Sequence, residues 1–300
     1  MSDKSFIRAS LFFDLQAAIN VSLLAIPQGM AYALVAGLPI HYGLLGSAFA
    51  SFLGGVIGKT RYITLGPTNA TSVLLFGVFA SLSLIQQSGI VSQLGIEILP
   101  WIIFFAGVLL IAASLLRISY MVQFISRTVI TAYVTAAAFL IIANQVKHIL
   151  GLTFPEGSTP SSFVEILGFL FSSAKSISFP PLLLSLITAL IFLFFQSKLK
   201  AFPNVALTLL ISAIAALFFK LNGFDLTYLD SFDNDWAFLS LPSVKGLSHY
   251  WQTILWSSFA IALLCLLEGL SIGKSLAARC GQRIDTNRET LSIGISNIGC

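Results

Sequence analysis

The stretch RYITLGPTNATSVLLF, residues 61–76, places several polar side chains directly before an apolar run. Proline suits the first position of a helix, so Pro67 predicts a helix start at this point. The N–H groups that follow would then be free and lie at the positive end of the helix dipole. Such a helix start binds anions without any fixed positive charge. The alternative is that residues 59–67 form an ordinary turn, with Thr68 or Asn69 as a plain N-cap.

Glu268 is an acid deep inside the apolar segment ALLCLLEGLSIG. An ionisable side chain at such a depth costs about 2.5–3.5 kcal/mol on insertion scales, and its default interpretation is functional. A carboxyl group in this position is a candidate proton carrier. It equally suits a sodium ligand, or a hydrogen bond that joins two helices.

A third polar group lies in the segment LAIPQGMAYALVAGLP, residues 24–39. Pro27 removes a backbone donor, so we expect the helix to be kinked or broken there. Gln28 then lies beside the freed carbonyl groups, and Tyr32 lies on the same face one turn later. The alternative is a packing kink in which Gln28 bonds its own backbone.

The composition indicates what surrounds these residues. Hydrophobic residues make up 57% of the 300-residue chain and charged residues 9%, with a mean hydropathy of +0.93. A soluble domain carries about 25% charged residues. This chain cannot cover its surface with polar groups, so we expect an all-α polytopic membrane protein whose solvent is the lipid bilayer.

Apolar windows of about twenty residues mark the membrane-spanning helices. Segments 147–178 and 220–250 are the expected long polar connections. The last apolar stretch ends at Cys300 without a polar tail, so we expect the chain to be a fragment of a longer protein. The expected helices are 15–35, 43–58, 67–85, 98–116, 127–146, 179–196, 204–219, 251–273 and one starting near 289.

The basic residues orient these helices. With a cytoplasmic N-terminus, twelve of the 16 Lys and Arg residues fall on the inner side and four on the outer side. The excess of inner positive charge predicts a multi-pass protein with its N-terminus in the cytoplasm. The membrane that we expect for it is the bacterial inner membrane.

Several other classes are excluded. The basic residues are scattered rather than clustered, so no nucleic-acid partner is expected. Three cysteines and three histidines lie too far apart for a disulfide framework, a metal site or a nucleophile constellation. No phosphate-binding loop is present. We therefore expect no enzyme, no cofactor and no metal.

Four stretches together resemble the SulP family, the sulfate permease-like anion transporters. These are IPQGMAYALVAGLPIHYGLLGS, GKTRYITLGPTNATSVLL, RISYMVQFISRTVITAYVTAAAFLIIANQVKHILGL and GKSLAARCGQRIDTNRETLSIGISNIG. They follow in order along nearly the whole chain. One departure is Thr68, where the family has an aromatic or aliphatic residue after Gly-Pro.

The resemblance implies an inverted-repeat fold of two times seven membrane segments, of which the first repeat and the start of the second are present. It also implies a homodimer and a core domain that moves against a gate domain like an elevator. The expected parts are a cytoplasmic N-terminus at 1–14, core at 15–117, gate at 118–222, an extracytoplasmic loop at 223–250, and the start of the second repeat, again core, at 251–300.

The resemblance further implies an anion held between the N-terminal ends of the third and tenth segments. Thr68, Asn69 and Ala70 would form the third-segment end, Gln28 and Tyr32 would line the site, and Glu268 matches an acidic position linked to cation coupling. The tenth segment and a regulatory STAS domain would lie outside this chain.

The function expected is secondary active transport of an inorganic anion, sulfate first, by an elevator mechanism coupled to protons through Glu268. The alternatives are sodium-coupled bicarbonate transport, or an anion channel, exchanger or non-transporting sensor on the same fold.

Overall fold

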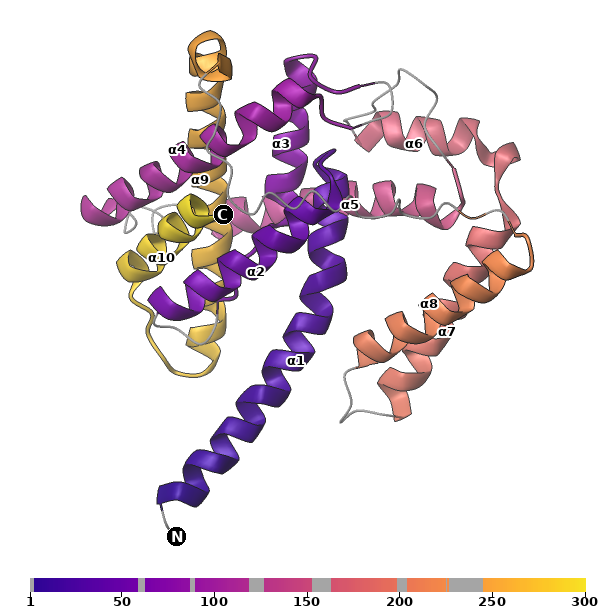
Figure 1. Cartoon of the computed structure of the whole chain (residues 1–300), viewed down its shortest axis with the longest axis horizontal. Coiled ribbons are helices and arrows are strands. Elements are labelled where there is room, and N and C mark those ends of the chain that lie inside the picture. The colour runs from indigo at the N-terminus through magenta and orange to yellow at the C-terminus, as the bar shows by residue number, and fades with distance from the viewer. Residues whose placement is uncertain are drawn as a thin grey trace. The chain divides into compact units, whose positions relative to one another are not determined.

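The structure is a computed structural model that describes residues 3–58, 63–86, 90–118, 127–152, 163–198, 204–224, 226 and 245–300. The described residues form α-helices and one short 3-10 helix, η2 (Ala174–Ser176), plus an isolated bridge between Ile85 and Val91. Figure 1 shows the helices. They are α1 (Asp3–Val35), α2 (Ile40–Ile57), α3 (Asn69–Ser81), α4 (Gln93–Leu115), α5 (Arg127–Ile149), α6 (Phe163–Ser172), α7 (Phe179–Lys198), α8 (Asn204–Leu221), α9 (Lys245–Arg279) and α10 (Thr286–Gly299).

Five of the described helices are long and apolar enough to cross a membrane. The spans are Ala17–Val35, Ile40–Ile57, Gln93–Leu115, Phe179–Lys198 and Tyr250–Arg279. Each of them overlaps a helix predicted from the sequence. The expected helical membrane protein is therefore confirmed in its element types, with boundaries that differ by several residues.

The expected break at Pro27 is wrong, because α1 runs from Asp3 to Val35 with Pro27 inside it. The candidate membrane span of α1, Ala17–Val35, agrees with the predicted segment 15–35. Helix α3 is shorter than the predicted segment 67–85, because it begins at Asn69 and ends at Ser81. The segment 147–178 is not only a polar connection, because it contains α6, whose sequence FVEILGFLFS is apolar. The polar residues 153–162 and most of 225–244 lie outside the described residues.

The chain forms two compact units. The larger unit contains α2, α3, α4, α9 and α10, with α1 from Gly29 onward and α5 as far as Ile141. The smaller unit contains α6, η2, α7 and α8, with α1 as far as Gln28 and the last part of α5. The division into core and gate domains at residues 117 and 118 stays a prediction.

Helix α4 is the centre of the larger unit. It packs against both α9 and α10, while α10 also packs against α2, and α3 packs against α9 (Figure 1). The fully buried side chains between these helices include Phe79 of α3, Ile98 and Ile102 of α4, and Ile254 and Leu270 of α9. This packing holds α9 beside α4, and α3 beside α9.

Glycines allow close approach of two helix pairs in the larger unit. A methyl group on Gly107 of α4 would lie 2.7 Å from the Gly294 carbonyl oxygen of α10. A methyl group on Gly43 of α2 would clash with the Gly29 carbonyl group of α1. The hydrophobic driving force between helices is weak in lipid. Small residues at such crossings stabilise the pair instead, because they allow the two backbones to pack closely.

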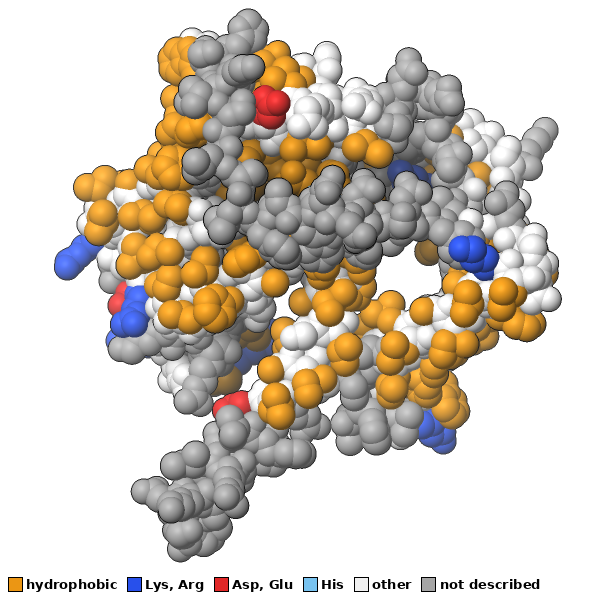
Figure 2. All heavy atoms as spheres, in the orientation of Figure 1, with side chains coloured by type: hydrophobic (Ala, Val, Ile, Leu, Met, Phe, Trp, Pro, Cys, Tyr) orange, Lys and Arg blue, Asp and Glu red, His pale blue; other side chains and the backbone are white. Residues whose placement is uncertain are grey.

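The smaller unit presents apolar side chains outward. Helices α7 and α8 pack against each other, and α7 buries none of its residues. Figure 2 shows hydrophobic side chains gathered along α7 and α8. The more exposed ones include Leu186, Leu190 and Phe194 of α7 and Ile214 of α8. A helix that is apolar on every face needs lipid or further protein around it.

Candidate functional site

The start of α3 is organised by Thr68. Thr68 is the N-cap, with extended backbone at φ −119° and ψ 158°. Its hydroxyl oxygen accepts a hydrogen bond from the Thr71 N–H at 3.3 Å, and its own N–H donates to the Thr71 hydroxyl oxygen at 3.2 Å. This reciprocal pair is a capping box. The prediction that Pro67 occupies the first helical position is wrong, because Pro67 lies one residue before the cap.

Two N–H groups remain available at this helix end. The Ser72 N–H donates to the Thr68 carbonyl oxygen at 3.0 Å, so the Thr68, Thr71 and Ser72 donors are all used locally. Among the described residues, no acceptor is present for the backbone N–H groups of Asn69 and Ala70. These are the donors that a helix N-terminus offers to an anion.

The same two residues are sheltered. Asn69 is 8% exposed and Ala70 is 6% exposed. The Asn69 side-chain nitrogen Nδ2 is buried and donates to none of the described residues. A buried amide without an acceptor is costly, and its N–H donors suit a negatively charged ligand.

Thr68 also contacts the acid of α9. Its hydroxyl group donates a hydrogen bond of 2.8 Å to Oε2 of Glu268, across 200 residues of sequence. Glu268 is half-buried and lies well inside the candidate span Tyr250–Arg279. The structure therefore brings together two polar features that were predicted separately, the start of the third segment and the intramembrane acid. The same bond supports the alternative that Glu268 joins two helices by a hydrogen bond, here as the acceptor.

Glu268 is not the only acid within the apolar helices. Glu97 is half-buried and lies inside the candidate span Gln93–Leu115. Glu289 is 3% exposed in the first turn of α10, where a negative charge is favourable next to the helix dipole. Glu268 differs from both in its hydrogen bond to the cap of α3.

The other two predicted site residues lie on α1. Gln28 is exposed and belongs to the smaller unit, whereas Tyr32, one turn later, is half-buried and belongs to the larger unit. Both make interactions within the structure. Their part in a binding site stays a prediction.

The described residues contain no group of three or more His, Cys, Asp or Glu side chains arranged to hold a metal ion. All three cysteines are free thiols. The chemistry available at the start of α3 is therefore hydrogen bonding by two N–H groups, one amide and one hydroxyl group beside a carboxyl group.

Comparison with known proteins identifies the family. The family model described as the sulfate permease family matches residues 11–300. The chain belongs to the sulfate permease family. This result confirms the resemblance that the four sequence stretches indicated.

Individual relatives in this family are distant and longer. Sulfate transporter 4.1, chloroplastic, of Arabidopsis thaliana is 28% identical over 95% of this chain and 41% of its own length. Solute carrier family 26 member 6 of Homo sapiens is 26% identical over 97% of this chain and 40% of its own length. The chain thus spans less than half the length of these curated relatives.

Solved structures show the same fold. The transmembrane domain of the cyanobacterial bicarbonate transporter BicA superposes with a TM-score of 0.76 at 23% identity, covering 95% of this chain and 70% of that one. Murine Solute Carrier 26 family member A9 in the inward-facing state gives a TM-score of 0.76 at 21% identity, covering 93% of this chain and 48% of that one. The fold class expected from the sequence is confirmed.

The Thr68 hydroxyl group is expected to be important for the stability of this family member. Thr68→Val removes both the cap and the partner of Glu268. Loss of an N-cap costs about 0.5–2 kcal/mol, and loss of a hydrogen bond to a charged group costs about 1.5–3 kcal/mol. We expect Thr68→Val to lower the melting temperature of the full-length protein in detergent, and Thr68→Ser to retain it. A double-mutant cycle with Glu268→Ala should be clearly non-additive.

Thr188→Val is the matched control, because among the described residues the Thr188 hydroxyl group bonds only the Leu184 carbonyl oxygen of its own helix, at 2.8 Å. Its effect should add to that of Glu268→Ala. Additive effects of Thr68→Val and Glu268→Ala would show that the hydroxyl–carboxylate bond does not form.

Proposed function

We propose that the complete protein is a secondary active transporter of an inorganic anion, sulfate first, and that Glu268 couples transport to protons. One observation carries the proposal: the hydroxyl group that caps α3 also donates to the Glu268 carboxylate at 2.8 Å. The free N–H groups of Asn69 and Ala70 and the acid belong to one connected cluster. Membership of the sulfate permease family, and relatives named as sulfate transporters, support an anion as the substrate.

The coupling follows from electrostatics. An ionised Glu268 places a negative charge one hydrogen bond away from the helix end that would receive the anion. Like charges in a medium of low dielectric constant repel each other strongly. Protonation of Glu268 removes this repulsion, so a proton and an anion favour each other's binding. Because coupling between two ligands is reciprocal, the bound anion also favours the protonated carboxyl group. This arrangement suits symport.

The mechanism proposed is elevator-type alternating access. The core at 15–117 and 251–300 carries the anion site and moves against the gate at 118–222, as the family resemblance implies. Support for a rigid core comes from the packing of α4 against α9 and α10. Tyr32 and Gln28 of α1 would line the path of the anion in this scheme.

Sulfate uptake into proteoliposomes containing the full-length protein tests the function. We expect an inward proton gradient to accelerate sulfate uptake in the wild type. Glu268→Gln mimics the protonated carboxyl group and keeps an acceptor for Thr68, so this variant should bind sulfate but lose acceleration by the gradient. Glu97→Gln, which changes a half-buried acid in another span, is the matched control and should retain the acceleration.

Each alternative gives a different result in this assay. Uptake of bicarbonate that requires sodium would replace the sulfate–proton assignment with sodium-coupled bicarbonate transport. Uptake that requires a counter-anion inside would indicate an exchanger. Currents far above carrier turnover would indicate a channel, and anion binding without flux a sensor.

The contribution of the backbone is tested at Asn69, the first residue of α3. Asn69→Pro removes the N–H group and the amide, whereas Asn69→Ala removes the amide alone. Proline is tolerated at this helix position, and the extended backbone of Thr68 is the conformation that a residue before proline prefers. A hydrogen bond to a charged group contributes about 1.5–3 kcal/mol, so we expect sulfate affinity to fall about tenfold or more from Asn69→Ala to Asn69→Pro.

The measurement is sulfate binding to the purified variants, with the melting temperature as the check on folding. Equal sulfate affinities for Asn69→Pro and Asn69→Ala would remove this N–H group from the anion site.

We also propose a homodimer in the bacterial inner membrane with a cytoplasmic N-terminus, from the family resemblance and the distribution of basic residues. Cys280 is exposed in the turn between α9 and α10, which this orientation places in the cytoplasm. A membrane-impermeant maleimide should label Cys280 in inside-out vesicles and not in spheroplasts, with Cys280→Ser as the control. Labelling in spheroplasts would reverse the orientation. The mass of the solubilised particle tests the dimer.

A further inference from the structure

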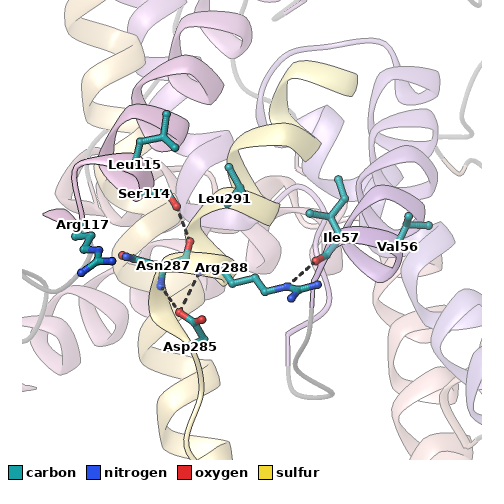
Figure 3. Close-up of a pocket in the computed structure, with 9 residues that line it drawn as sticks. All are labelled: Val56, Ile57, Ser114, Leu115, Arg117, Asp285, Asn287, Arg288 and Leu291. Atoms are coloured by element: carbon teal, nitrogen blue, oxygen red, sulfur yellow. Dashed lines mark hydrogen bonds between the residues drawn. The ribbon is translucent and has the colours of Figure 1, made fainter.

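A second polar feature lies away from the start of α3. It is a pocket of about 520 Å³ where α2 and α4 end and α10 begins (Figure 3). Its lining includes two arginines, Arg117 after α4 and Arg288 in the first turn of α10, together with apolar side chains of α2, α4 and α10. The transport mechanism proposed above uses none of these residues.

Hydrogen bonds fix the polar wall of the pocket. The Ser114 hydroxyl group of α4 donates to the Asn287 carbonyl oxygen of α10 at 2.7 Å (Figure 3). The Asp285 carboxylate accepts from the N–H groups of Asn287 at 3.1 Å and Arg288 at 3.3 Å. The ends of α4 and α10 are thereby tied together, so the pocket has a defined shape.

Arg117 is fixed through its backbone, whereas Arg288 is fixed through its side chain. Arg117 has left-handed backbone at φ 57°, and its backbone N–H donates to the Ser114 carbonyl oxygen at 3.0 Å. The Arg288 side chain reaches toward α2, where its Nε donates to the Ile57 carbonyl oxygen at 3.5 Å. Within the described part of the chain, neither guanidinium group pairs with a carboxylate, and Asp285 is occupied by the cap of α10. The pocket therefore carries an excess of positive charge.

The position of the pocket relative to the membrane follows from the helices around it. Helices α2 and α4 are both candidate membrane spans, and they end at Ile57 and Leu115. Apolar side chains near these two ends are exposed: Val56 is 67% exposed and Leu115 is 74% exposed. The pocket thus lies at the level where hydrocarbon ends and lipid head groups begin.

Arginine is the side chain best suited to phosphate at such a level. Its planar guanidinium group donates two parallel hydrogen bonds to phosphate oxygens and is more weakly hydrated than an ammonium group. Anionic lipids attract basic side chains near the membrane surface. A pocket with two arginines and an apolar rim offers partners to a phosphate group and to the acyl chain next to it.

We propose that this pocket binds a phosphate group, carried by an anionic phospholipid of the adjoining leaflet or by a soluble phosphate ester. The exposed apolar side chains Val56 and Leu115, which line the pocket, favour the lipid. The proposal is independent of the transported anion, because the pocket and the start of α3 share no residue.

Native mass spectrometry of the full-length protein tests the proposal, with phosphatidylglycerol, phosphatidylcholine and inorganic phosphate as separate additions. Removing two basic side chains near an anionic lipid should weaken binding about tenfold or more, so we expect that loss of phosphatidylglycerol affinity in Arg117→Gln/Arg288→Gln. Arg279→Gln/Arg283→Gln is the matched control, because it removes two exposed arginines that do not line the pocket. The control should keep the wild-type affinity, and phosphatidylcholine should bind weakly to all three proteins.

The two sources of phosphate are separated by which ligand needs the pocket arginines for binding. Phosphatidylglycerol binding that depends on the pocket arginines assigns the site to lipid. Inorganic phosphate binding that depends on them, without lipid binding, assigns it to a soluble phosphate ester. Equal weakening in both double variants, or no weakening in the pocket variant, would overturn the proposal. If the double variant does not fold, Arg117→Gln carries the test, because the Arg117 side chain bonds no described residue.

Discussion

A polar group within hydrocarbon must form its hydrogen bonds inside the protein, and the hydroxyl group of Thr68 supplies a partner to two neighbours at once. It accepts from the Thr71 N–H and donates to the Glu268 carboxylate. One hydroxyl group therefore defines where α3 begins and how α9 faces it. Thr68 caps the helix by accepting from the Thr71 N–H, so the N–H groups of the two residues between them, Asn69 and Ala70, are left available. The free N–H groups of the helix end and the position of the acid beside it therefore depend on the same residue.

That hydrogen bond requires α3 and α9 to be held at a fixed separation, and α4 provides the support. Phe79 of α3 is fully buried in the cluster that also contains Ile98 and Ile102 of α4. On the other side, the buried Ser258 hydroxyl group of α9 donates to the Ile102 carbonyl oxygen of α4 at 2.9 Å. A change in the packing of α4 would therefore move the two partners of the Thr68–Glu268 bond relative to each other.

The sequence predicts the parts of this arrangement better than their connection. The membrane helices are recognisable because long apolar runs are rare in soluble chains, and Glu268 stands out because an acid is rare within such a run. The pairing of Thr68 with Glu268 spans 200 residues and leaves no local pattern. Helix α6 escapes a twenty-residue window because it has ten residues. At α3, the sequence offers Pro67 as the first helical residue and Thr68 or Asn69 as the N-cap, and in the structure Thr68 is the N-cap.

The placement of charge explains why two such different polar sites occur in one chain. A fixed cation inside the bilayer costs several kcal/mol, whereas the N–H groups of a helix end add positive potential without adding a net charge. The anion site that we propose at the start of α3 is of this second kind, and it lies next to Glu268. Arg117 and Arg288 lie instead at the ends of membrane helices, where water and head groups solvate a guanidinium group. In the proposed mechanism, protonation of Glu268 changes the attraction for the anion at the start of α3, which suits an anion that must be released. A ligand that stays bound suits the two arginines, because arginine keeps its charge at every physiological pH.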